Sequence, residues 1–209
     1  MWVVLFLLGC YHGINPAMGW LFAVALGLQE RSTRAVAAAI VPIAIGHIAS
    51  VAVVVSVALT AAGTFPQPAV RVIAALLLVG FGVYRLVRAR HPRWLGMRVG
   101  FGGLVLWGFL MASAHGAGLM LLPFVLPASP MAMDASMPMP LAAHGVSAGV
   151  EMGVLIVCVH SLGYLLVTTV VAFLVYRRFG LKLLRTAWFN IDLVWAVVLI
   201  AAGLIALAT

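Results

Sequence analysis

Four histidines lie deep inside apolar stretches of this sequence. His12, His47, His115 and His160 each stand about a dozen residues from the nearer end of an apolar run, which at about 1.5 Å per helical residue places all four imidazoles near the middle of a bilayer. Ionisable groups at that depth are costly and usually face a bundle interior or a water-filled path. Because imidazole is the commonest side-chain ligand of transition metals, the four together predict a metal-ion site. Any one of them is also explained by a hydrogen bond between two helices.

Two methionines stand near these histidines and add soft sulfur donors to the predicted site. Met18 follows His12 by six residues, and Met111 precedes His115 by four, which is one helical turn. A thioether suits soft ions such as Cu(I). Apolar packing is the alternative interpretation of each methionine, since methionine commonly fills gaps in a helical core.

A third group of soft donors stands in the segment 128–145, where methionines alternate with small residues and proline. Met133, Met137 and His144 are the candidates for a second, weaker place of metal capture in this segment. The alternative is that the segment lies on the membrane surface or is disordered, with methionine acting as an apolar filler.

The composition indicates which elements must position these residues. The 209 residues are 66% hydrophobic and 8% charged, against about 25% charged residues in soluble domains. A membrane-spanning helix needs about 20 mainly apolar residues. The sequence therefore predicts an all-α integral membrane protein, a single transmembrane domain over 1–209 with no room for a catalytic soluble domain. Its six expected helices cover 2–28, 36–62, 70–88, 101–127, 146–176 and 187–208.

The charged residues predict the orientation of these helices. The net charge is +8, but the basic residues stand in short gaps between apolar runs rather than on a folded basic face, which argues against nucleic-acid binding. The excess of basic residues after the first, third and fifth helices predicts cytoplasmic loops there, with both termini and the 128–145 segment outside. Four carboxylates in the whole chain are too few for an oxygen-rich Ca²⁺ or Mg²⁺ cage.

An internal repeat divides the chain into halves of about 1–98 and 99–209. Tyr11-His12-Gly13 is echoed by Ala114-His115-Gly116, and Gly46-His47 by Val159-His160. Three helices per half invert the second copy relative to the first, an arrangement that recurs in transporters. Glycine and proline after the histidines of the first and fourth helices predict broken helices near the midplane, and we expect such breaks to expose carbonyls for ion binding.

These motifs together show a resemblance to a known family. His12-Gly13-Ile14-Asn15-Pro16, Gly46-His47 and the glycine-rich end of the third helix at 80–85 resemble the nickel/cobalt transporter (NicO-like) branch of the LysE superfamily. The second half is similar to the UreH-like membrane proteins of that superfamily. The resemblance implies a six-helix pump or permease for a transition-metal ion in which His12, Asn15 and His47 match the family's metal-site positions. His115 and His160 are added by the internal symmetry.

The sequence departs from the family at two of these positions. The nickel families place an acidic residue and a second histidine around the first-helix proline, where this chain has Asn15 and Met18. An amide and a thioether make the site softer and less negative, which favours a Cu(I)-like ion on ligand grounds.

We therefore expect a secondary transporter of a transition-metal ion, not an enzyme, with no permanently bound cofactor, in a bacterial-type inner membrane. Its expected partners are the lipid bilayer, the ion, and a second copy or a metalloenzyme-assembly protein. Two alternatives remain: a metal-delivery membrane subunit, and a CcdA-like thiol–disulfide electron carrier with Cys10 and Cys158 as its redox pair. Side chains two residues apart on a helix point nearly opposite ways, so neither cysteine shares a face with the histidine that follows it.

Overall fold

The computed structural model describes residues 1–87, 100–126, 145–179, 196–197, 199–201 and 203–204 of the chain. Throughout these ranges the backbone is helical or forms short turns, with no strand. The predicted all-helical class is therefore confirmed for the described residues. Met133, Met137 and His144, predicted as a place of metal capture, lie outside them, as does most of the helix expected at 187–208.

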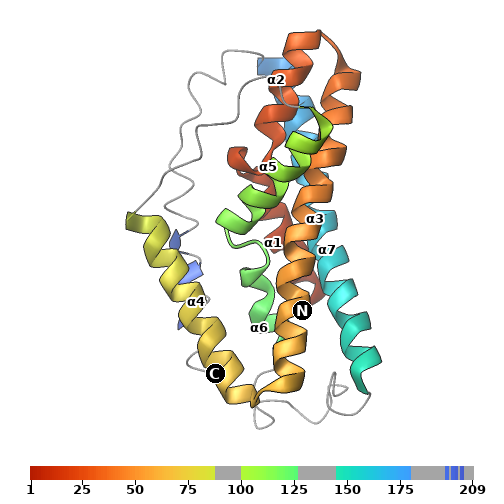
Figure 1. Cartoon of the computed structure of the whole chain (residues 1–209). Coiled ribbons are helices and arrows are strands. Elements are labelled where there is room, and N and C mark those ends of the chain that lie inside the picture. Colours follow the sequence, from red (N-terminus) through yellow and green to blue (C-terminus); the bar gives the residue numbers. More distant parts are fainter. Residues whose placement is uncertain (88–99, 127–144, 180–195, 198, 202, 205–209) are drawn as a thin grey trace. The chain divides into compact units, whose positions relative to one another are not determined.

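The helices follow the predicted apolar runs, with two runs divided (Figure 1). Pro42 lies inside α3 without ending it. The helical elements are α1 (Trp2–Ile14), the 3₁₀ turn η1 (Pro16–Met18), α2 (Trp20–Glu30), α3 (Thr33–Thr64), α4 (Gln67–Val87), α5 (Phe101–Ala114), the 3₁₀ turn η2 (Leu119–Leu121), α6 (Leu122–Val125), α7 (Gly145–Leu174) and the π-helical turn η4 (Val175–Phe179).

Two of the described helices, Thr33–Thr64 and Gly149–Arg178, are long and apolar enough to cross a membrane. A third span results if α5 and the broken segment after it, Leu119–Val125, count as one. The remaining apolar helices are shorter, at Trp2–Ile14, Trp20–Glu30 and Pro68–Tyr84. The chain thus has helices of membrane-spanning length, and the predicted number of six stays a prediction.

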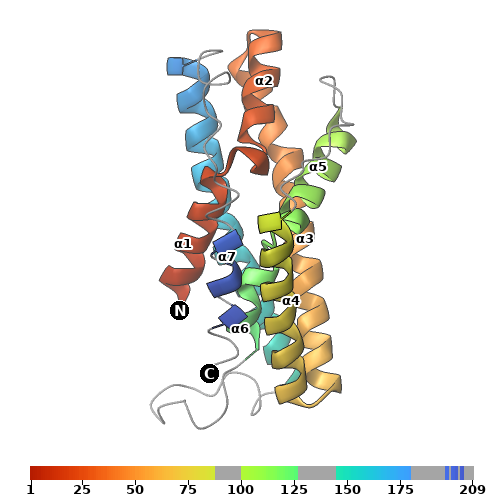
Figure 2. The same cartoon turned by 90° about the vertical axis from the view of Figure 1, so that its left-hand side faces the viewer.

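The run predicted at 2–28 is divided because two residues in it cannot continue a helix. Pro16 has no backbone N–H and pushes the residue before it into the extended region, and Asn15 has φ −66° and ψ 122°. Gly19 has φ 121°, which is accessible to glycine and strained for other residues. The chain therefore leaves α1 at Ile14, makes the turn η1, and starts α2 in an offset position, as Figure 2 shows.

The chain forms two compact units, and each is described by itself. Unit 1 comprises Met1–Ser50, Arg90–His115 and Val159–Ile191. Its apolar core joins α2, the first part of α3, α5 and the end of α7. The buried core residues are Trp20, Ala23, Val24, Val36, Ala39, Ile40, Ile43, Leu104, Ala172 and Val175.

Glycines bring two pairs of helices of unit 1 into backbone contact. Between α1 and α7, a Cβ on Gly9 would overlap the carbonyl oxygen of His160, and a Cβ on Gly163 would overlap that of Phe6. Between α3 and α5, Gly46 and Gly108 meet the facing backbone in the same way. Small residues at such crossings are typical of helices packed in membranes, where close van der Waals contact and interhelical hydrogen bonds drive association.

The surface of the long helices is apolar where water-soluble helices are polar. On α7, Leu162, Leu166 and Val170 are each about half exposed and follow one another at four-residue spacing. The buried side of the same helix carries polar residues, including His160 and Thr168. Apolar residues outside and polar residues inside are expected for helices surrounded by lipid.

Unit 2 comprises Val51–Ala89, Gly116–Cys158 and Asp192–Thr209. In it α3 and α7 are packed through Gly153, which faces Leu59, and α4 packs on the described C-terminal residues through Gly82 and Gly203. Gly116 has φ 69° at the start of the turn between α5 and η2. Histidines 12, 47, 115 and 160 all belong to unit 1.

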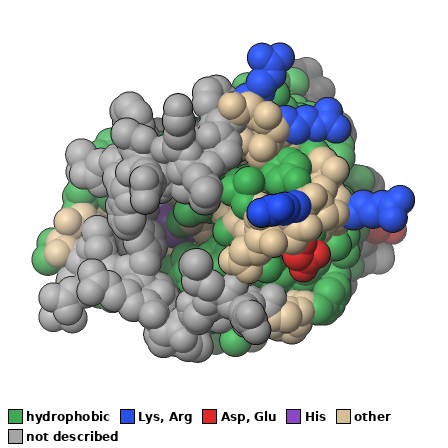
Figure 3. All heavy atoms as spheres, turned by 90° about the horizontal axis from the view of Figure 1, so that it is seen from above, with side chains coloured by type: hydrophobic (Ala, Val, Ile, Leu, Met, Phe, Trp, Pro, Cys, Tyr) green, Lys and Arg blue, Asp and Glu red, His purple; other side chains and the backbone are tan. Residues whose placement is uncertain are grey.

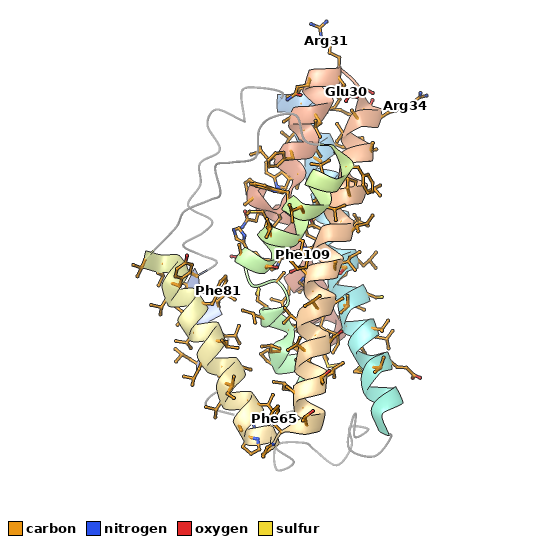
Figure 4. The ribbon with its side chains drawn as sticks, in the orientation of Figure 1. Glu30, Arg31, Arg34, Phe65, Phe81 and Phe109 are labelled. Atoms are coloured by element: carbon orange, nitrogen blue, oxygen red, sulfur yellow. The ribbon has the colours of Figure 1, made fainter. Side chains whose placement is uncertain are left out.

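Basic residues gather at one end of unit 1. Arg31 and Arg34 project outward from the turn between α2 and α3 (Figure 4), and the end-on view in Figure 3 shows arginine side chains on this face. Arg177 and Arg178 are exposed in η4, and Tyr176 of the same turn faces Gly27 of α2. The basic segments after the first and fifth predicted helices therefore lie at the same end of the unit.

Candidate metal-ion site

Three of the four predicted histidines converge. His12 from the last turn of α1, His47 from α3 and His160 from α7 are 0%, 1% and 0% exposed. Their ring centroids lie 5.6 Å apart for His12 and His47, 5.4 Å for His12 and His160, and 5.7 Å for His47 and His160. Each imidazole therefore lies beside the other two, and we call these three residues the histidine trio.

The close packing of α1 and α7 explains why two members of the trio meet. Gly9 and Gly13 stand four residues apart on one face of α1, and their missing side chains let the backbone of α7 approach. His12 lies between these glycines in the sequence, and a Cβ on Gly9 would overlap the backbone of His160 itself. The short interhelical distance thus directs both imidazoles into the same small space.

Two members of the trio, His47 and His160, are polar but poorly hydrogen-bonded within the described residues. Both ring nitrogens of His47 are buried without a hydrogen-bond partner among the described residues. The Leu5 carbonyl lies near the His160 ring, but no hydrogen bond of good geometry reaches either of its nitrogens. A buried polar group without a partner costs about 1–3 kcal/mol, which is large against a total stability of about 5–15 kcal/mol. These nitrogens are therefore suited to a further ligand.

The three rings lie close together, but they are not oriented around one common position. In the described part of the chain, no group of three or more His, Cys, Asp or Glu side chains has the geometry to hold a metal ion in this conformation. His47 and His160 are nearly parallel, with an interplanar angle of 12°, whereas His12 makes angles of 68° and 75° with them. Binding one ion would require rotation of at least some of the rings.

His115, the fourth predicted histidine, is held by its own helix. It follows α5 directly, is fully buried, and its Nδ1 lies 2.9 Å from the carbonyl oxygen of Met111. A carbonyl can only accept, so Nδ1 carries the proton in this hydrogen bond. His115 belongs to the same compact unit as the trio.

The other predicted site residues are buried, and two have structural tasks. The side-chain oxygen of Asn15 accepts a hydrogen bond from the Ala17 backbone N–H at 3.0 Å and caps η1, while its Nδ2 is buried without a partner among the described residues. The oxygen is the atom that could bind a cation, so capping competes with that role. Met18 and Met111 are each 1% exposed, and their carbonyls accept hydrogen bonds from Tyr164 and His115.

The break between α1 and α2 is held by side-chain donors. The helix termini on either side of the break leave carbonyls without an intrahelical partner. Four of the carbonyls that we expected to be exposed to an ion accept hydrogen bonds from side chains instead. Each of four carbonyls accepts from one side chain: Gly13 from Thr168 at 3.4 Å, Ile14 from Trp20 at 2.9 Å, Ala17 from Trp107 at 3.3 Å and Met18 from Tyr164 at 2.7 Å.

Tyr164 is the main residue of the site that the sequence analysis missed. Its ring stacks on His47 with a centroid distance of 3.7 Å and an interplanar angle of 7°. The signal was present in the sequence, because His160, Tyr164 and Thr168 follow one another at four-residue spacing and so form a polar stripe on one face of an apolar helix.

A pair of equivalent contacts supports the internal repeat. The hydroxyls of Ser50 and Ser113 lie 2.8 Å apart, joining α3 to α5. When His47 is matched with His160 and His12 with His115, Ser50 matches Gly163 and Ser113 matches Cys10. A Cβ on Gly163 would lie 3.0 Å from the backbone nitrogen of Cys10, so the matched positions meet in the second helix pair as well.

The cysteines proposed as a redox pair are both free thiols. Cys10 is partly buried in α1, and Cys158 is exposed on α7. The carboxylates of the described residues, Glu30 and Glu151, are both exposed. Within these ranges the histidine trio has no buried acidic partner.

Comparison of the chain with protein-family models, with curated proteins and with solved structures gives no match. We therefore infer the function of the chain from the residues of unit 1 and from their geometry.

Proposed function

We propose that the chain is a secondary membrane transporter of a transition-metal ion, which the histidine trio binds inside the helix bundle. The single observation that carries this proposal is the convergence of His12, His47 and His160, buried and within 5.4–5.7 Å of one another. Three buried imidazoles in an apolar bundle, two of which (His47 and His160) have ring nitrogens without a hydrogen-bond partner among the described residues, match the ligands that transition metals prefer.

The spacing of the rings is close to that of a metal site. Three imidazoles that bind one ion tetrahedrally with metal–nitrogen distances of about 2.0–2.1 Å have ring centroids about 5 Å apart. The observed separations exceed that value by less than 1 Å. Rotation of the rings, with small movements of their helices, would therefore be enough to form the site.

Six spans in two inverted halves, with both termini outside, are the architecture that we assign to this transporter. The equivalent contacts of Ser50–Ser113 and Gly163–Cys10 support the repeat. The grouping of Arg31 and Arg34 with the basic turn η4 supports a common cytoplasmic side for those two loops. Together with the motifs around His12 and His47, these observations favour a distant member of the LysE superfamily, in the cytoplasmic membrane of a bacterium.

The charge of the site favours a soft monovalent ion such as Cu(I) over Ni²⁺ or Co²⁺. The ligands that the structure brings together are neutral imidazoles, and the described carboxylates are exposed. The cost of burying an ion rises with the square of its charge, so a divalent ion costs about four times as much as a monovalent one before ligand contacts are counted. Met18 is buried, and its backbone carbonyl accepts a hydrogen bond from Tyr164; its thioether is a candidate further ligand that suits a soft ion.

Transport into proteoliposomes tests the proposal. The purified protein should move Cu(I), or Ag⁺ as its redox-inert substitute, and should bind Ni²⁺ and Co²⁺ more weakly. His12→Ala and His47→Ala should each weaken ion binding at least about 100-fold, since even loss of a residue that only hydrogen-bonds to a metal ligand costs about 10–100-fold in affinity. Leu162→Ala, at an exposed apolar position, is the matched control and should transport normally. Full transport by both histidine variants would contradict the proposal.

A further inference from the structure

We propose that Tyr164 is a positioning residue that links the orientation of the His47 ring to the closed state of the break between α1 and α2. This inference rests on the proposed function for its purpose, because the link matters where His47 binds a transported ion. The structural link itself depends on Tyr164, because this one buried side chain both stacks on His47 and donates to the Met18 carbonyl.

The hydroxyl end of Tyr164 holds the break. It donates to the Met18 carbonyl at 2.7 Å, the shortest of the four side-chain bonds to the segment between Gly13 and Met18. Met18 is the last residue of η1, directly before the positive-φ Gly19. The bond therefore fixes the point at which the chain turns from η1 into α2.

The ring of Tyr164 orients His47. At 3.7 Å and 7° the two rings are in face-to-face contact, and the hydroxyl bond restricts rotation of the tyrosine. The His47 ring can turn towards an ion only if it slides across the tyrosine or if the tyrosine moves with it. Both ring nitrogens of His47 lack a partner among the described residues, so the stacking is the main described contact that fixes this imidazole.

The helix that carries Tyr164 gives the link a rigid base. A Cβ on Gly13 would lie 2.7 Å from the Tyr164 carbonyl oxygen and 3.0 Å from the Thr168 nitrogen. Thr168, one turn further on, donates to the Gly13 carbonyl. Because this turn of α7 packs directly on the end of α1, the backbone that carries Tyr164 is held in place while its side chain moves.

This link couples ion binding by the histidine trio to opening of the break between α1 and α2. When an ion draws the His47 ring out of its stacked position, the Tyr164 ring loses its partner, and the hydroxyl bond to Met18 weakens with it. The break then opens more readily. Conversely, opening of the break frees the His47 ring to turn towards the ion, so ion binding and opening favour each other.

Two spectroscopic readouts on the full chain test the link without relying on transport. The first is hydrogen–deuterium exchange of residues 13–20 in nanodiscs, which reports opening of the break. The second is NMR of histidine-labelled protein in detergent micelles, in which the His47 ring resonances carry the ring-current shift of Tyr164. Both are measured in a Cys10→Ser, Cys158→Ser background, with and without Ag⁺.

Tyr164→Phe keeps the ring and removes the hydroxyl. We expect exchange in residues 13–20 to rise about five- to tenfold, as for the loss of one buried hydrogen bond, and the His47 resonances to move in the same variant. The matched control is Trp107→Phe, which removes the donor to the Ala17 carbonyl in the same break. It should raise exchange and leave the His47 resonances unchanged. Tyr164→Leu should abolish the ring-current shift and raise the half-saturating Ag⁺ concentration about tenfold.

The inference is overturned if Tyr164→Phe changes neither readout, or if Trp107→Phe shifts the His47 resonances as strongly as Tyr164→Phe does. Failure of the proposed function has a different signature. In that case the parent protein binds no Ag⁺, Ni²⁺ or Co²⁺, while Tyr164→Phe still changes exchange and the His47 resonances together.

Discussion

In unit 1, α1 packs on α7 and α3 packs on α5, and in both pairs glycine brings the two backbones into direct contact. Gly9 faces the backbone of α7, and Gly46 faces that of α5. Each pair carries two of the four histidines. At the level of the backbone, the two pairs are built alike.

The side chains of the two pairs differ. The first pair has Cys10 against Gly163, a contact without a polar bond, and the second has Ser113 against Ser50 with their hydroxyls 2.8 Å apart. Both histidines of the first pair belong to the trio, whereas His115 of the second is bonded to the carbonyl of its own helix. A repeated backbone arrangement therefore does not make a symmetric binding site, because local hydrogen bonds decide which imidazoles remain for a ligand.

The largest effect is expected from substitution of the contact glycines, the feature in which the two helix pairs are most alike. Gly9→Ala and Gly46→Ala should both prevent accumulation of folded protein, because the added Cβ would overlap a backbone carbonyl rather than a flexible side chain. Gly102→Ala is the control, since no atom lies within 4 Å of its Cβ position. Size-exclusion chromatography in detergent measures the folded fraction. Normal accumulation of only one of the two variants would show that the pairs are less alike than their backbones suggest.

The next largest effect is a difference in ion affinity between variants of the histidines in the two helix pairs. His160→Ala should weaken ion binding at least about 100-fold, because it removes a member of the trio. His115→Ala should weaken it less than about tenfold, since the Nδ1 of His115 is hydrogen-bonded to the Met111 carbonyl. Equilibrium binding of Ag⁺ in detergent gives both values. Equal losses would mean that all four imidazoles bind the ion.

A smaller effect is expected from the serine pair. Ser50→Ala should lower the free energy of unfolding by about 0.5–1 kcal/mol, the usual value of a hydrogen bond between membrane helices. The loss stays small because Ser113 keeps its bond to the Phe109 carbonyl. Thermal unfolding in detergent measures the difference, and ion binding should stay within twofold of the parent. A loss above about 2 kcal/mol would give this contact a role that its geometry does not explain.

The smallest effect is expected at Cys10, the counterpart of Ser113. Cys10→Ser should leave ion transport within about twofold of the parent, because the free thiol at this position is only partly buried and is no member of the trio. Thiol–disulfide exchange with a reduced dithiol on one side of a vesicle is the parallel measurement. Electron transfer that disappears with Cys10→Ser would favour the redox-carrier alternative over the transporter.

The sequence predicted the helical class and the break after His12, because periodicity and proline act locally. It predicted one site of four histidines, and the structure brings three of their rings together. It did not predict the stacking of Tyr164 on His47, which depends on the register between α3 and α7. It also did not show that His115 is bonded to Met111, although a carbonyl four residues earlier is always near. The free carbonyls expected at the break are occupied, because tryptophan, tyrosine and threonine donors from other parts of unit 1 reach them.

The donors to the break between α1 and α2 come from three different helices. Trp20 belongs to α2, Trp107 to α5, and Tyr164 and Thr168 to α7. A displacement of any of these helices must therefore stretch a bond to the same short stretch of chain. Displacements of α2, α5 and α7 therefore all affect the break between α1 and α2, so one small reporter group at Ala17 would detect movement of any of these helices.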